Sequence, residues 1–394
     1  MESAQKGGPL GPAEEPVLTP TGAGPEPVNL KEFEAYAKNN MPRNAWDYYA
    51  SGALDMITLR ENRAAWGRLR FRPRILRDVT HVDASTTVLG KKVSMPICIA
   101  PTAMQQMAHP EGERANVLAA KNKGCLMTLS SWSTLSMEEV AEVAPDHPRW
   151  FQLYVYKDRE VTMDLIRRAE RAGYLAFAVT VDTPLLGRRE ADVRNRFSLP
   201  SHLTMGNFAN KGGDHSSGTK DAGAEGSGLA SYCASLIDRS LTWEDLRWLR
   251  ANTSLKIVVK GVATAEDAAI AVREGVDAIW ISNHGARQLD TTPATCEMIP
   301  EVVAAVGGRC EVYVDGGITR GADALKAVAL GCTAVFVGRP VLWGLAHSGQ
   351  AGVEKVLDLL KAEFEMAMML CGCVTVDDIK REMVTHATKF YSRL

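Results

Sequence analysis

Short apolar runs that alternate with amphipathic helical patterns limit most strongly what this chain can fold into. Eight such runs cover residues 94–101, 125–130, 150–156, 176–183, 255–261, 278–283, 310–315 and 334–338. Turn residues bound each run, and a helix candidate follows it. Runs that are apolar throughout are typical of parallel strands covered on both faces. The order predicts an α/β fold of the TIM (β/α)8 barrel type, with an open doubly wound sheet as the alternative.

The residues outside these runs suggest three parts. Residues 1–28 carry six prolines and few large apolar side chains, so we expect a disordered tail there. Residues 29–385 are expected to form the barrel domain, which begins with a helical segment at about residues 31–49. A Gly- and Ser-rich stretch at 206–228 predicts a long mobile loop after the fourth strand, and residues 386–394 form a C-terminal tail.

Composition excludes several classes of protein. The 45 basic and 47 acidic residues give a formal net charge of -2, so no basic field favours nucleic acid or anionic lipid. No stretch of about 18 uncharged apolar residues occurs, so we expect no membrane span. The 8 cysteines are scattered, and the 8 histidines are never within five positions of one another. We therefore expect reduced thiols and no metal site.

Polar residues gather where the predicted strands end, which is where a TIM barrel assembles its active site. They are Tyr154, Asp182, Lys260, His284, Asp315 and Arg339. The loops after the last two strands, 315–317 and 338–339, lie where this fold commonly binds phosphate. Their glycines let backbone N–H groups approach an anion, which Arg339 could bind in a bidentate manner. One Gly-Gly pair alone would indicate a simple turn, but two such loops favour a phosphate site.

Two of these residues have several possible roles. Lys260 lies inside an apolar run, where a structural ion pair, a Schiff-base nucleophile and a cation facing an electron-rich cofactor all remain open. His284 has Arg287 three positions further on, which suits a base beside an anchor for a carboxylate. Asp182 could orient the imidazole and stabilise its protonated form, or it could cap a turn before Pro184.

Several segments resemble the FMN-dependent (S)-2-hydroxy-acid oxidases of the glycolate oxidase type. The most specific are 282–290, which reads SNHGARQLD, and 181–190, which reads VDTPLLGRRE. Further similarity lies at 46–53, 100–104, 130–132 and 151–154, so the resemblance runs from about residue 29 to about residue 375. It implies a barrel that binds FMN and oxidises a short hydroxy acid, glycolate to glyoxylate or lactate to pyruvate. Oxygen would be the acceptor and hydrogen peroxide the product.

The resemblance also implies roles for the candidate residues. His284 would be the base at the C2–OH centre of the substrate, Asp182 would support its charge, and Tyr154 would hydrogen-bond the hydroxyl. Lys260 would face N1 and the C2 carbonyl of the flavin. The substrate carboxylate would be bound by Tyr48, Arg189 and Arg287, and Trp132 would favour short substrates. The flavin would be lined by Pro101, Thr102, Ala103, Ser130, Gln152, Thr180 and Ser282. Its ribityl and phosphate groups would be held by Asp315, Gly317, Gly338 and Arg339.

The chain departs from the family pattern at three places. Thr319 stands where family members often carry an arginine that contacts the phosphate. We therefore expect Arg339, Arg320 or backbone amides to make that contact, with weaker flavin binding. Leu185 replaces a basic residue of the plant relatives. The N-terminal extension is too short for the haem domain of the cytochrome-linked branch, which favours oxygen as the acceptor.

The last three residues of the sequence indicate a cellular location. Ser392-Arg393-Leu394 is similar to the S-K-L peroxisomal address, which predicts recognition by the peroxisomal import receptor. The family suggests a homotetramer. Two other functions stay open, namely a Schiff-base aldolase or lyase that uses Lys260, and a barrel that has lost catalysis and serves as a scaffold.

Overall fold

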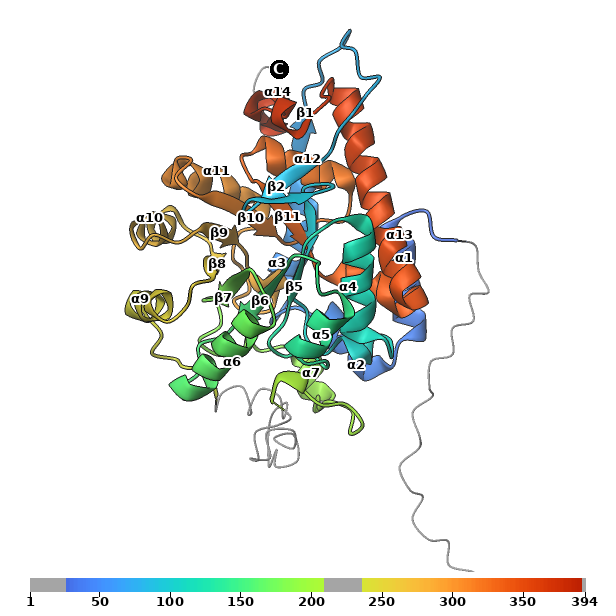
Figure 1. Ribbon diagram of the computed structural model, residues 1–394. Coiled ribbons are helices and arrows are strands. Elements are labelled where there is room, and N and C mark those ends of the chain that lie inside the picture. Colours follow the sequence, from blue (N-terminus) through green and yellow to red (C-terminus); the bar gives the residue numbers. More distant parts are fainter. Residues whose placement is uncertain (1–25, 209–235, 392–394) are drawn as a thin grey trace, which may run out of the picture.

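The computed structural model describes residues 26–208 and 236–391. Within them, eight parallel strands close into a barrel in the order β10-β11-β4-β5-β6-β7-β8-β9 (Figure 1). The strands are β4 (Ile97–Ile99), β5 (Met127–Leu129), β6 (Arg149–Leu153), β7 (Ala176–Thr180), β8 (Lys256–Val262), β9 (Ala278–Ile281), β10 (Glu311–Asp315) and β11 (Ala334–Val337). Each predicted run coincides with one strand, although β6 begins one residue before its run and β8 ends one residue after its run. The TIM barrel prediction is confirmed, and the open doubly wound sheet is excluded.

Helices surround the barrel, as expected for strand-helix units. They are α4 (Gly112–Lys123), α5 (Met137–Val143), α6 (Arg159–Arg171), α9 (Trp243–Ala251), α10 (Ala265–Arg273), α11 (Thr295–Val306), α12 (Gly321–Ala329) and α13 (Arg339–Cys371). Local sequence sets their ends. The side chain of Thr264 accepts the N–H of Asp267 at the start of α10, and Gly124 takes a left-handed conformation after α4. Helix α13 is interrupted at Ser348 and Gly349, which have non-helical backbone angles.

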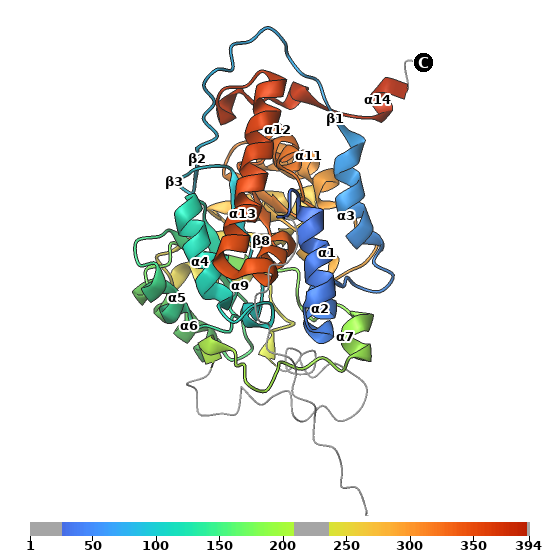
Figure 2. The ribbon, with the colours of Figure 1, turned by 90° about the vertical axis from the view of Figure 1, so that its right-hand side faces the viewer.

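The predicted N-terminal helical segment is present as two helices, α1 (Leu30–Asn40) and α2 (Arg43–Ala50). They separate at Pro42, because a proline lacks the N–H for a helical hydrogen bond and disfavours helical geometry in the preceding residue. A third helix that we did not predict, α3 (Ile57–Arg68), follows and packs against α11. Helix α1 packs against α13, and Figure 2 shows the three N-terminal helices outside the barrel.

The barrel interior is filled with large side chains and is closed at one end. Trp150, Trp280, Tyr313 and Phe336 are buried in one cluster, with ring centroids 3.8 to 5.6 Å apart. The hairpin of β2 (Thr86–Val88) and β3 (Lys91–Val93) contributes Val88, Leu89 and Val93 to this cluster. The N–H of Leu89 donates to the carboxylate of Glu311, which begins β10 (3.1 Å). The hairpin therefore seals the end at which the strands begin.

Smaller elements complete the described chain. Strand β1 (Leu69–Phe71) pairs antiparallel with β12 (Val384–His386), and two short helices are α7 (Glu190–Arg194) and α14 (Thr388–Tyr391). The 3-10 helices are η1 (Gln105–Met107), η2 (Gly206–Phe208), η3 (His284–Ala286), η4 (Val376–Asp378) and η5 (Arg381–Met383). Most of the predicted tail, the predicted loop from residue 209 onward and the C-terminal tripeptide lie outside the described residues.

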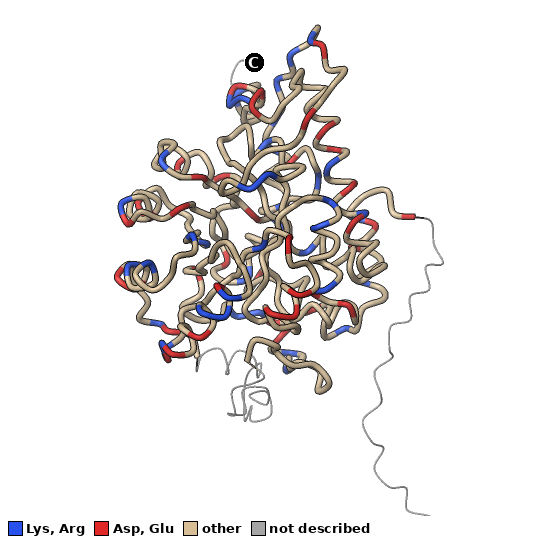
Figure 3. The backbone as a smooth tube through the Cα atoms, in the orientation of Figure 1, with Lys and Arg blue, Asp and Glu red and all other residues tan. Residues whose placement is uncertain are grey.

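The surface of the described chain carries both signs of charge, as the near-zero net charge predicts. Basic and acidic residues are interspersed along the outer helices, as Figure 3 shows. Among the described residues, no helix is long and apolar enough to cross a membrane. In the same residues, no group of three His, Cys, Asp or Glu side chains could hold a metal ion.

Candidate active site

A cavity opens at the carboxyl ends of the barrel strands, with an empty volume of about 1200 Å³ that includes its open mouth. Because parallel strands end at the same face, side chains from distant parts of the sequence converge there. All but two of the predicted site residues line this cavity. The two exceptions are Asp182 and Ser282, which hydrogen-bond the lining residues His284 and Lys260 from behind.

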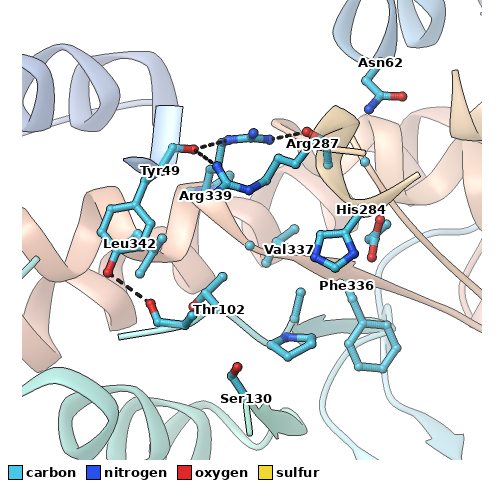
Figure 4. Close-up of a pocket in the computed structure, with 18 of the residues that line it drawn as sticks. Tyr49, Asn62, Thr102, Ser130, His284, Arg287, Phe336, Val337, Arg339 and Leu342 are labelled. Carbon is cyan, nitrogen blue, oxygen red and sulfur yellow. Dashed lines mark hydrogen bonds between the residues drawn. The ribbon is translucent and has the colours of Figure 1, made fainter. Parts of the chain in front are cut away.

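Asp182, which follows β7, and His284, which follows β9, form an imidazole–carboxylate pair. Nδ1 of His284 lies 2.8 Å from Oδ1 of Asp182, which also accepts the hydroxyl of Thr183 (2.8 Å). Gly261 makes this arrangement possible, since a Cβ there would lie 2.7 Å from the Cβ of Asp182 and the glycine has φ +115. Helix η3 presents the imidazole to the cavity (Figure 4).

Burial and charge set the protonation states of this pair. Burial lowers the pKa of His284 below its ordinary value of 6.5, and the charge of Asp182 offsets only part of this effect. Burial alone would raise the pKa of Asp182, but His284 and Lys260 outweigh it, so the pKa lies below its ordinary value. Near neutral pH the carboxylate is therefore ionised and the imidazole neutral. With Nδ1 on the carboxylate, Nε2 is left to accept a proton.

Lys260 places a buried positive charge at the floor of the cavity. Its side chain is 5% exposed, and Nζ donates to Oγ of Ser282 (3.0 Å) and lies 3.5 Å from Asp315. Asp315 also accepts the hydroxyl of Ser282 (2.8 Å) and the indole N–H of Trp280 (3.0 Å). The carboxylate and the hydroxyl stabilise the ammonium in its buried position.

Two buried guanidinium groups meet at another wall, beside the ring of Tyr48. Cζ of Arg287 lies 4.7 Å and Cζ of Arg189 lies 5.9 Å from the centre of that ring. Burial and, to a smaller extent, the charge of Arg189 lower the pKa of Arg287 to about 10. Arg189 pairs with Asp192 (3.3 Å), and its Nε is buried with no hydrogen-bond partner among the described residues. This wall holds more positive than negative charge and therefore suits a small carboxylate.

The remaining wall carries an aromatic pair and a polar group. The indole of Trp132 lies 4.8 Å from the ring of Tyr154, and its N–H donates to the hydroxyl of Tyr156 (3.1 Å). Gln152 is fixed between neighbouring strands, because its amide accepts the N–H of Ser131 (3.2 Å) and donates to Thr180 (3.0 Å). Both Trp132 and Gln152 are almost fully buried, so their orientation is set before any ligand arrives.

The opposite end of the cavity is suited to an anion. Helix α13 begins there after Gly338, and among the described residues no side chain caps its N-terminus. Helix N-termini attract phosphate through free N–H groups and the helix dipole. Gly316 and Gly317 line the same end with φ +102 and +72. A Cβ at Gly317 would lie 1.8 Å from the carbonyl oxygen of Asn62, so only glycine fits.

The side chain of Arg339, which we expect at the phosphate, is held by backbone carbonyls in the structure. Its guanidinium donates to the carbonyls of Tyr49 (2.7 Å), Gly285 (3.0 Å) and Ser51 (3.0 Å), as Figure 4 shows in part. The sequence could not reveal this, because the partners are backbone groups up to 290 positions away. Arg320 also points elsewhere and donates to Glu363 (2.6 Å).

Four polar or aromatic residues are among those of the site that sequence reasoning missed. Tyr49, Asn62 and Arg63 line the cavity from the N-terminal helices, and Tyr156 holds Trp132 from behind. Tyr49 belongs to the similar segment 46–53 and could have been found there. The others carry no local signal, because their positions depend on how α3 and β6 pack.

The geometry defines the class of protein: a barrel with the features of an enzyme, in which a proton acceptor, a wall suited to a carboxylate and an end suited to a phosphate group share one cavity at the carboxyl ends of the strands. Comparison with known proteins makes the assignment specific. The model of the FMN-dependent dehydrogenase family matches residues 37–386, and the chain belongs to this family.

Individual relatives agree with the family assignment. The chain is 57% identical over 359 residues to glycolate oxidase of Spinacia oleracea, covering 91% of this chain and 96% of the relative. It is 56% identical over 356 residues to glycolate oxidase 3 of Arabidopsis thaliana, covering 90% and 95%. A crystal structure of mandelate oxidase with (S)-4-hydroxymandelic acid superposes with a TM-score of 0.86 at 42% identity, covering 91% and 98%.

The family supplies FMN as the cofactor, and the cavity fits this group. The open N-terminus of α13 and the cradle at Gly317 suit a phosphate. Buried Lys260 suits the electron-rich edge of a flavin. The expected FMN dependence is therefore confirmed by the family, and the cavity offers the matching chemistry at both ends.

Proposed function

We propose that this protein oxidises glycolate to glyoxylate, and lactate to pyruvate as a second short substrate, with oxygen as the acceptor and hydrogen peroxide as the product. The observation that carries the proposal is the pairing of His284 with Asp182 in the same cavity as Arg189 and Arg287. A proton acceptor and a carboxylate site in one cavity are what a 2-hydroxy acid requires. The identity to two plant glycolate oxidases supports glycolate in particular.

The substrate-binding roles follow from the charges and the shape of the walls. Arg287, Arg189 and Tyr48 bind the substrate carboxylate and orient the C2 carbon. Tyr154 hydrogen-bonds the hydroxyl oxygen. Trp132, held by Tyr156 at 3.1 Å, leaves little room for a long side chain and so favours substrates of two or three carbons.

The proton-transfer role belongs to His284. Its neutral imidazole takes up a proton from the C2–OH centre, and the ionised Asp182 stabilises the imidazolium that forms. FMN, when bound, would supply the acceptor for the two electrons removed from the substrate, with oxygen as the final acceptor. Lys260 supplies a positive charge that favours electron density on the flavin ring.

The predicted cofactor contacts divide between the two ends of the cavity. The ring would be lined by Pro101, Thr102, Ala103, Ser130, Gln152, Thr180 and Ser282. The ribityl and phosphate groups would be held by Asp315, Gly317, Gly338 and the backbone N–H of Arg339. The Schiff-base alternative receives no support from the comparisons, and Lys260 is held by Ser282 and Asp315.

The proposal is tested with His284→Gln and its anaerobic reduction by glycolate. The variant should purify with its yellow flavin but should not be bleached, because no base accepts the substrate proton. Photochemical reduction of the same sample should still bleach the flavin, which is the control. Bleaching by glycolate at the wild-type rate would place the base elsewhere, and a wild-type protein that binds no FMN would remove the proposed function.

We also propose a homotetramer that is imported into peroxisomes through Ser392-Arg393-Leu394. The family resemblance supports the assembly, and the tripeptide together with peroxide production supports the location. Light scattering after size-exclusion chromatography tests the assembly. A fluorescent fusion with and without the tripeptide tests the import, which should be lost when the tripeptide is removed.

A further inference from the structure

The loops after β10 and β11 leave the anion end of the cavity without a free cationic side chain. Position 319 is a threonine, the guanidinium of Arg339 is used by three carbonyls, and Arg320 is paired with Glu363. The N-terminus of α12 is also closed. Asp323 accepts the N–H groups of Thr319 (3.2 Å) and Arg320 (3.1 Å). A phosphate at this end would thus meet backbone N–H groups but no side-chain cation from either loop.

Arg63 lies at the same end of the cavity but comes from α3. It lines the cavity together with Gly317 and Thr319. The backbones are in direct contact, because a Cβ at Gly317 would lie 2.9 Å from the backbone nitrogen of Arg63. The charge of Arg63 is also felt inside the site. Burial, then Arg287 and then Arg63 lower the pKa of Arg339 to about 9.

The present partner of Arg63 is one that a phosphate can replace. Its two terminal nitrogens donate to the carboxylate of Glu34 on α1, at 2.9 and 2.8 Å. The side chains are 43% and 27% exposed, so this is a surface ion pair, and such pairs contribute little to stability. A phosphate carries more negative charge than a carboxylate and binds arginine in the same bidentate way.

We propose that Arg63 is the side-chain cation that binds the phosphate of FMN in this chain, and that its guanidinium passes from Glu34 to the phosphate when the cofactor binds. The inference rests on the proposed flavin function. It assigns to a helix outside the barrel the contact that neither phosphate loop supplies. Glu34 then acts as a competitor that keeps Arg63 neutralised until FMN arrives.

The test compares FMN with riboflavin, which lacks only the phosphate. Full-length protein freed of flavin is titrated with each, and binding is followed by flavin fluorescence. Arg63→Gln should raise the Kd for FMN by about 10- to 100-fold, the range expected for a lost charged hydrogen bond. The Kd for riboflavin should stay within about twofold. Arg60→Gln is the matched control, since Arg60 lies on the same helix and donates to the carbonyl of Asp55 (2.9 Å).

Two further variants test the position and the exchange. Thr319→Arg added to Arg63→Gln should restore FMN affinity, because both side chains would reach the same phosphate. Glu34→Gln should lower the Kd for FMN and leave the Kd for riboflavin unchanged, because the competing carboxylate is gone. Equal losses for FMN and riboflavin in Arg63→Gln, no loss for either, or a phosphate-specific loss in Arg320→Gln would overturn the assignment. A wild-type protein that binds neither flavin would instead refute the proposed function.

Discussion

His284 is made into a base by its surroundings rather than by its own chemistry. Burial keeps the imidazole neutral, while the carboxylate of Asp182 holds Nδ1 and stabilises the imidazolium once it forms. A carboxylate that alone made the imidazole more basic would leave it protonated near neutral pH. The two opposing effects give a group that is free to accept a proton and is stabilised once it has done so.

The pH dependence of catalysis follows from this balance. The pKa of His284 lies below 6.5, so the base form persists at neutral pH and is lost as the pH falls through that lowered value. We expect kcat/KM for glycolate to decline on the acid side only below pH 6.5. Asp182→Asn should move this limb to lower pH and reduce the plateau by at least about 100-fold. Peroxide release across the pH range measures both effects, and an acid limb above pH 6.5 would contradict the assignment.

Binding of the substrate carboxylate should depend on the shape of the Arg287 side chain. Arg287→Lys keeps the charge but loses the bidentate guanidinium. Transition-state stabilisation should fall by about 2–3 kcal/mol, so kcat/KM should fall roughly 30- to 150-fold. Arg188→Lys, at the exposed position next to Arg189, is the control and should change little. Steady-state kinetics at equal flavin content provide the comparison. An unchanged kcat/KM in Arg287→Lys would exclude the anchoring role.

Individual residues of the site were predictable where they belong to a continuous motif. His284, Arg287 and Asp182 stand in short segments whose pattern could be read directly. Arg339 lines the predicted cavity, but its hydrogen bonds to carbonyls of a distant segment could not be read from the sequence. Arg63 escaped notice for the same reason, since its place beside Gly317 exists only after α3 has packed.

At the level of elements, α13 depends on two glycines that let its halves touch. The helix is interrupted at Ser348 and Gly349, and Gly344 and Gly352 meet across the interruption. A Cβ at Gly352 would lie 1.9 Å from the carbonyl oxygen of Gly344. Close packing of this kind leaves no space for even one methyl group.

Gly352→Ala should therefore lower the free energy of unfolding by about 1–3 kcal/mol, the usual effect of overpacking. Gly67→Ala is the matched control, because Gly67 is exposed on α3 and a Cβ there would meet no atom within 4 Å. It should stabilise the protein by about 0.4–1 kcal/mol. Urea denaturation of both variants measures the difference. Equal effects of the two substitutions would contradict the packing argument.

The barrel strands were predictable because continuous apolar runs leave few alternatives in a chain of this length. All observed strands except β8 are shorter than the runs, since hydrogen bonding ends where the strands turn outward into loops that carry polar residues. The hairpin of β2 and β3 and the helix α3 were not predicted. The hairpin strands are short and partly charged, as at Lys91 and Lys92, and contacts with the barrel hold them, while α3 packs against α11.

For the whole molecule, the two ends of the barrel have separate tasks. The hairpin seals one end with apolar side chains, and the cavity occupies the other. A packing defect at the sealed end should therefore leave catalytic activity unchanged. This separation allows stability and catalysis to be changed independently.

Val88→Ala tests the separation. Val88 is fully buried in the sealed end, so the substitution should lower the free energy of unfolding by about 1–3 kcal/mol. At a temperature where the variant is folded, kcat/KM and FMN content should match the wild type. Chemical denaturation and peroxide release give the two quantities. A large loss of kcat/KM in a fully folded, flavin-loaded variant would show that the ends are coupled.

The clamp of Arg339 on the carbonyls of Tyr49 and Ser51 also determines when the pocket can exist. These groups are up to 290 positions apart, so the wall they form is absent until nearly all of the polypeptide has left the ribosome. A nascent chain that has completed only its first strands has no place to capture its cofactor. We therefore expect ribosome-bound fragments that stop before Arg339 to remain colourless, because they lack the arginine that completes this wall.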